Sequence, residues 1–309
     1  MKKYLSPLLL LLTALIWGFA FVAQKSASTL PTFTILFTRS FIAVFALIIA
    51  VIFFDKVSGS GRKLFSSKKI DITGREIIAG IVCGSLLFLA SALQQLGIAD
   101  TDTGKTAFIT ALYVVIVPIY ALLWGKKSSF NAWLGIGIAV IGFYLLCIKD
   151  GFTIAPSDFI VVLSAFAFAM QIMAVDLLLP GCDGVRLSLV QFATITVLSG
   201  IASLIFAPNV EFSALKAAVP DILYLGIASS GVAYTLQIIG QKHTHPALAS
   251  IILSLESVFG AFFSAIVLRE RMSPREYIGC AVVLFAVIIS QLDFSKFFKK
   301  NNADADFQN

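Results

Sequence analysis

The chain consists largely of apolar runs, each about as long as a helix that crosses a lipid bilayer. Ten such runs occupy residues 7–24, 33–54, 75–97, 104–124, 130–148, 156–178, 186–207, 220–241, 246–268 and 275–292. A bilayer core needs roughly 17 to 25 apolar residues per helix, so each run is long enough to span it. With 59% hydrophobic and 13% charged residues, the chain lacks the polar surface of a soluble globule. The sequence therefore predicts an all-α membrane protein with ten transmembrane helices.

The ninth run, 246–268, carries one carboxyl group near its middle. At ~1.5 Å rise per residue, Glu256 lies roughly 14 Å from either end of the run, close to the midplane of the bilayer. A charge at that depth costs about 2.5 to 3.5 kcal/mol even on the mild insertion scales. Two interpretations remain open: a protonated carboxyl that hydrogen-bonds a neighbouring helix, or a carboxyl that lines a polar cavity or pathway.

The two halves of the chain resemble each other in order. LQQLG at 93–97 aligns with LQIIG at 236–240, and the same register aligns Leu112 with Leu255. Five helices per half is an odd number, so two such halves must have opposite orientations in the membrane. We therefore expect two inverted five-helix repeats, with the substrate bound near the midplane between them. The expected parts are 7–148 for the first repeat, 156–292 for the second, and 293–309 for a polar cytoplasmic tail.

The basic residues predict the orientation of the chain. If the N-terminus is cytoplasmic, most of the 23 Lys and Arg residues fall on the inner side, as expected for a protein of the cytoplasmic membrane. An even number of spans then places both termini inside. This distribution fits membrane topology and anionic lipid, and it gives no indication of nucleic-acid binding.

Three functional classes remain, of which a secondary carrier fits best. The connections are short, and the longest, 55–73, is basic and rich in Ser and Gly, so no soluble domain is present to hydrolyse ATP. An enzyme acting on lipids or lipid-linked substrates would need more clustered polar residues than the sequence offers. A channel would need a continuous polar stripe. No cofactor is expected, and His243 and His245 alone are too few to predict a metal site.

The sequence resembles the EamA-type permeases of the drug/metabolite transporter superfamily. The resemblance covers about residues 7–292 and rests on WGFAFVAQK at 17–25, Arg39, TALYVVIVPIYALLWGKK at 110–127 and LSLESVFGAFFSAIVLRERMSPREYIG at 253–279. It implies a ten-helix inner-membrane carrier that moves a small metabolite, often outward, by alternating access. A drug efflux carrier of the same fold is the alternative within this superfamily.

The repeat register also predicts candidate site residues. It places Tyr113 opposite Glu256 at mid-depth, where inverted repeats form a central cavity. Trp17, Ser230 and Tyr234 lie at similar depth. Packing between helices explains small and aromatic residues equally well, so binding and packing both remain open for these three.

Three further polar residues lie nearer the membrane faces. Gln94 and Gln237 are related by the repeat and fall near opposite faces, where they are weak candidates for outer and inner gates. Arg39 lies about 9 Å below the outer face, where its side chain could bind an anionic group or snorkel to the interface. Snorkelling is the simpler explanation. Protons are the candidate coupling ion, because Glu256 can change its protonation when the cavity opens to water.

Overall fold

The computed structural model describes residues 2–57, 65–66, 69–70, 72–101, 103–147, 155–207, 210–267 and 273–291. Nearly all of these residues are helical, apart from β1 (Phe65–Ser66) and β2 (Lys69–Ile70), which pair antiparallel. The predicted cytoplasmic tail at 293–309 lies outside the described residues.

The helices follow one another with short connections. In chain order they are α1 (Lys2–Ser26), the 3₁₀ helix η1 (Ala27–Thr29), α2 (Thr32–Val57), α3 (Gly74–Asp100), α4 (Thr103–Ala111), α5 (Tyr113–Leu123), α6 (Phe130–Cys147), α7 (Pro156–Leu178), α8 (Gly184–Phe206), α9 (Phe212–Ala217), α10 (Val219–Leu223), the π-helix η2 (Tyr224–Ala233), α11 (Tyr234–Gln241), α12 (Pro246–Leu253), α13 (Glu256–Val267) and α14 (Pro274–Gln291).

Eight helical segments of the described chain are long and apolar enough to cross a membrane. They correspond to eight of the ten predicted runs. The remaining two runs correspond to α6, a shorter apolar helix, and α14, each with 18 residues. Large apolar side chains on the outer faces are exposed, including Ile49 at 68% and Leu204 at 78%. Such a surface suits contact with lipid rather than water.

Three of the spanning segments, each predicted as one continuous helix, are interrupted in the structure. Leu112 separates α4 from α5, and Ser254 and Leu255 separate α12 from α13. At both breaks the backbone makes tighter bonds, from Leu112 N to Ile109 O and from Leu255 N to Ile252 O. The repeat register aligns Leu112 with Leu255, so the two breaks occur at corresponding positions of the two halves.

The third interruption is the ten-residue π-helix η2 between α10 and α11. Its sequence, YLGIASSGVA, is rich in small residues, which allow a wider helical turn to lie close to its neighbours. A side chain at Gly226 would collide with Ile42 Cβ at 2.8 Å and with Arg39 O at 3.0 Å. Stretches of π-helix are rare and often mark functional sites. Here the small residues bring η2 directly against α2.

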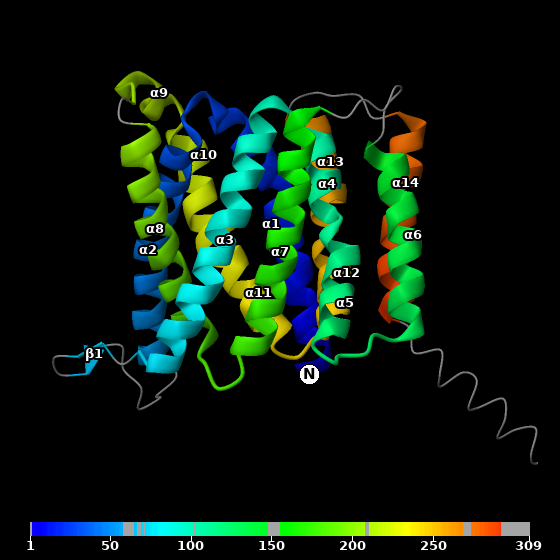
Figure 1. The fold of residues 1–309 in the computed structure, drawn as a ribbon, viewed down its shortest axis with the longest axis horizontal. Helices are drawn as coiled ribbons and strands as arrows, with labels where there is room; N and C mark the ends of the chain where they lie inside the picture. The colour runs from blue at the N-terminus through cyan, green and yellow to red at the C-terminus, as the bar shows by residue number, and fades with distance from the viewer. Residues whose placement is uncertain are drawn as a thin grey trace, which may run out of the picture.

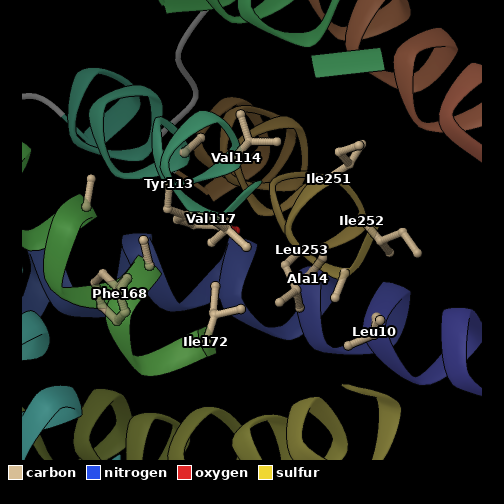
Figure 2. Packing of buried hydrophobic residues seen from close by; sticks show 14 of the residues in the cluster. Leu10, Ala14, Tyr113, Val114, Val117, Phe168, Ile172, Ile251, Ile252 and Leu253 are labelled. Atoms are coloured by element: carbon tan, nitrogen blue, oxygen red, sulfur yellow. The ribbon is translucent and has the colours of Figure 1, made fainter. Parts of the chain in front are cut away.

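The helices form a bundle whose axes run roughly parallel, with α6 and α14 side by side at one edge (Figure 1). The N-terminal end of α1 and β1 lie at one end of the bundle, and α9 lies at the other (Figure 1). The central core joins α1, α5, α7 and α12, through residues such as Leu10, Val114, Ile172 and Ile252 (Figure 2). Figure 2 also places Tyr113 within this packing.

Candidate substrate pocket

A pocket lies inside the bundle and is lined by side chains from both halves of the chain. It encloses about 490 Å³ of empty space, part of which is open to solvent. Seven of the eight candidate residues line it: Trp17, Arg39, Gln94, Tyr113, Tyr234, Gln237 and Glu256. Ser230, the eighth, lies behind the wall and contacts Arg39. The structure thus brings together residues that are up to 239 positions apart in the printed sequence.

Glu256 and Tyr113 are the first residues after the two breaks. Glu256 begins α13 and is 5% exposed, while Tyr113 begins α5 and is 2% exposed. The two side chains lie within electrostatic reach of each other. The Tyr113 hydroxyl and the Glu256 carboxyl face each other as hydrogen-bonding groups, although their geometry is looser than that of an ordinary bond. These two buried polar groups therefore interact with each other inside the pocket.

Arg39 points into the protein, not toward the outer face. Its side chain is 6% exposed. Its Nε donates to Ser230 Oγ at 3.0 Å and its Nη2 donates to Ser229 Oγ at 3.3 Å. The interpretation that Arg39 snorkels to the interface is therefore wrong. The depth of a residue along a helix does not determine which face it occupies, and here the π-helix η2 offers two hydroxyl groups on the inner face.

Aromatic rings form another wall of the pocket. The rings of Trp17 and Tyr234 lie 4.6 Å apart between centroids, and the ring of Phe192 lies 5.5 Å from that of Tyr234 in an edge-on arrangement. The indole Nε1 of Trp17 donates to the carbonyl oxygen of Ser229 at 3.4 Å. This bond fixes the ring against η2. The pocket thus combines two tilted aromatic rings with the nearby guanidinium.

The two glutamines predicted as gates occupy opposite ends of the pocket. Gln94 lies about 9 Å before the end of α3 and Gln237 about 6 Å before the end of α11, and these helices run toward opposite ends of the bundle (Figure 1). Gln94 donates to Thr110 Oγ1 at 3.1 Å, and Gln237 donates to Gln171 Oε1 at 3.2 Å. The pocket therefore extends along the bundle axis.

Several lining residues were not identified from the sequence. They include Phe21, Gln24, Ser91, Thr110, Phe168 and Gln171. Gln171 could have been found, because an amide in the middle of the run 156–178 is as unusual as Glu256 in its own run. Phe168 could have been found from the repeat, because LTALIW at 12–17 resembles LSAFAF at 163–168 and so aligns Phe168 with Trp17.

Two ion pairs join α7 to the α4–α5 segment at opposite ends. Lys105 pairs with Asp158, and Lys126 pairs with Asp176. His245 lies near the second pair, and burial holds the pKa of His245 below its ordinary value. The imidazole is therefore neutral at neutral pH and does not compete with Lys126 for Asp176. In the described part of the chain, no group of three or more His, Cys, Asp or Glu side chains is placed to hold a metal ion.

Comparison with known proteins finds similar sequences and a similar fold. The EamA-like transporter family matches residues 5–148 and 155–292. An uncharacterized transporter of Archaeoglobus fulgidus is 29% identical over 293 residues, covering 94% of this chain and 87% of the relative. An uncharacterized transporter of Methanothermobacter thermautotrophicus is 26% identical over 215 residues, covering 67% of this chain and 60% of the relative. A crystal structure with 18% identity and a TM-score of 0.72, covering 93% of this chain and 96% of that one, shares the fold.

Proposed function

Because this chain belongs to the EamA-like transporter family, we propose that it is a secondary transporter that exports a small metabolite across the cytoplasmic membrane by alternating access. The observation that carries the proposal is the pocket, in which Glu256 and Arg39 lie buried between helices of both halves. Ionisable groups inside a spanning bundle are expensive and mark substrate or ion pathways. Gln94 and Gln237 are the proposed gates at its two ends.

The packing of the helices supports two inverted repeats, 7–148 and 156–292. Helix α1 of the first half packs on the interrupted segment α12–α13 of the second half. Its counterpart α7 of the second half packs on the interrupted segment α4–α5 of the first half. Likewise α3 packs on α7, and its counterpart η2–α11 packs on α1. If each helix is replaced by its counterpart in the other half, the same kinds of helix contact result. Broken helices at the contact between repeats are a feature of secondary transporters, which bind their substrates there.

We expect both ends of the chain to face the cytoplasm, because ten spans and the distribution of Lys and Arg favour that orientation. Reporter fusions at the C-terminus measure it. A fluorescent protein fused there should be bright and a phosphatase fused there should be inactive. Phosphatase activity at that position would contradict either the number of spans or their orientation.

The two ion pairs along α7 are proposed to close the two ends of the pocket in turn. Opening one end then requires only one pair to break. We expect Asp158→Asn to slow transport by about tenfold. This is the effect expected when one closed state loses about 1.4 kcal/mol of stability. Transport rates in vesicles measure this change. Lys105→Gln removes the same pair and leaves the hydrogen bonds from Ala155 N and Thr101 Oγ1 to Asp158 in place. It should slow transport equally, and a normal rate in Lys105→Gln would rule out the pairing as the cause.

The proposed transport is tested by uptake and efflux of a metabolite panel in inverted and right-side-out membrane vesicles, with and without a pH gradient. We expect at least one solute to enter inverted vesicles that contain the protein and not vesicles without it. A panel of broad chemistry in which no solute moves would contradict the proposed function.

A further inference from the structure

The guanidinium of Arg39 is a buried charge without a counter-charge in the described part of the chain. Its hydrogen-bond partners are the hydroxyl groups of Ser229 and Ser230, which are neutral. No Asp or Glu of the described residues forms an ion pair with it. Its third nitrogen, Nη1, has no acceptor among those residues. Buried guanidinium groups are usually paired with an anion.

The two serines position the guanidinium without neutralising it. Both lie on the π-helix η2, and Gly226 lets η2 approach the backbone of Arg39. They occupy Nε and one proton of Nη2, so Nη1 and the second proton of Nη2 remain available to an anion that arrives through the pocket. A planar guanidinium can bind a carboxylate with two parallel hydrogen bonds.

Glu256 does not supply the missing charge. It lines the same pocket, yet no ion pair joins it to Arg39 among the described residues. Its electrostatic contacts are with Tyr113 and Tyr234. Tyr234 also lies within electrostatic reach of Arg39, so its side chain stands between the cationic part of the pocket at Arg39 and the acidic part at Glu256.

We propose that the transported substrate is a small organic anion, whose carboxylate binds Arg39 and whose compact apolar body packs against Trp17 and Tyr234. This proposal rests on the proposed transport function. The bound carboxylate compensates the buried guanidinium charge of Arg39, which would otherwise lie unpaired in a low-dielectric bundle.

The test is thermal unfolding of the purified protein in lipid nanodiscs with four probes that share a benzene ring and differ in charge. Benzoate is anionic, benzylamine cationic, benzyl alcohol neutral and phenylglycine zwitterionic. Because a ligand that binds the folded state stabilises it by mass action, benzoate should raise the unfolding midpoint at millimolar concentration and the other three should not. Benzoate that stabilises no more than benzyl alcohol would overturn the proposal, as would stronger stabilisation by phenylglycine or benzylamine.

Variants locate the effect at Arg39. Arg39→Gln should abolish the shift with benzoate, and Arg39→Lys, which keeps the charge but cannot form two parallel hydrogen bonds, should weaken benzoate binding by about tenfold. Arg275→Gln is the matched control, because Arg275 contacts Tyr144 outside the pocket, and it should bind benzoate normally. If Arg39→Gln does not fold, Arg39→Lys still decides: an unchanged affinity overturns the proposal. Failure of benzoate binding while vesicles still transport some solute would reject the anion and keep the carrier function.

Discussion

The Glu256→Gln variant should fold, bind and exchange substrate, yet lose the accumulation that a pH gradient drives. Glutamine keeps the shape and hydrogen-bonding capacity of the protonated carboxyl but cannot release a proton. If Glu256 takes up or releases a proton when the pocket opens to one side, the variant loses the link between proton flow and substrate movement. For one coupled proton, a gradient of one pH unit supports about tenfold accumulation. Inverted vesicles with an acidic interior should thus fall from about tenfold accumulation to none.

The alternative for Glu256 is a permanently neutral carboxyl that holds two helices together. That alternative predicts that Glu256→Gln accumulates substrate at the parent rate, whereas Glu256→Leu damages folding because it leaves polar partners unpaired. Glu211→Gln is the control, since Glu211 is an exposed acid beside α9, and it should accumulate substrate normally. Gradient-driven accumulation by Glu256→Gln at the parent level would assign Glu256 to helix packing.

The second large effect is expected at Gly142, where α6 touches α14. A Cβ atom at Gly142 would lie 2.8 Å from Val283 N and 3.0 Å from Gly279 O, which are backbone atoms of α14 that cannot rotate away. Gly142→Ala must therefore push the two helices apart. Overpacking of this kind costs about 1 to 3 kcal/mol. The midpoint of thermal unfolding in detergent or nanodiscs measures this loss.

Gly137 provides a control on the same helix. It is exposed on α6, and a Cβ atom there would meet nothing within 4 Å. Gly137→Ala should be neutral or stabilising by up to about 1 kcal/mol, because alanine favours the helix over glycine. Equal midpoints for Gly142→Ala and Gly137→Ala would mean that α6 and α14 are not in backbone contact.

The spanning helices could be predicted because membrane thickness constrains the length of an apolar run. Their interruptions could not. Leu112 and Leu255 are apolar residues with no helix-breaking chemistry, and the break between α12 and α13 involves serine hydroxyls that bond to backbone carbonyls, such as Ser254 Oγ to Ile251 O. Serines in spanning helices are too common to predict such a break. The small residues of η2 stand out in the sequence, but their composition does not distinguish a π-helix from close packing.

The site was predictable where a polar side chain is rare for its surroundings. Glu256 and the two glutamines stand out in apolar runs, and their positions in the pocket follow from the repeat register. Arg39 also stands out, but its direction depends on contacts with η2, some 190 residues later in the chain. Ser91 and Thr110 resemble ordinary packing residues of membrane helices. Such residues become visible as pocket walls only once the helices are placed side by side.

Counterflow in liposomes that contain only the purified protein tests most directly whether the pocket serves a carrier. Liposomes are loaded with a high concentration of an unlabelled solute, diluted, and given a trace of the same solute with a label. A carrier should accumulate the label transiently above its outside concentration, because it exchanges unlabelled solute from inside for labelled solute from outside. Label that only reaches the outside concentration would indicate a channel, label recovered in a chemically altered solute would indicate an enzyme, and either result would contradict a secondary transporter.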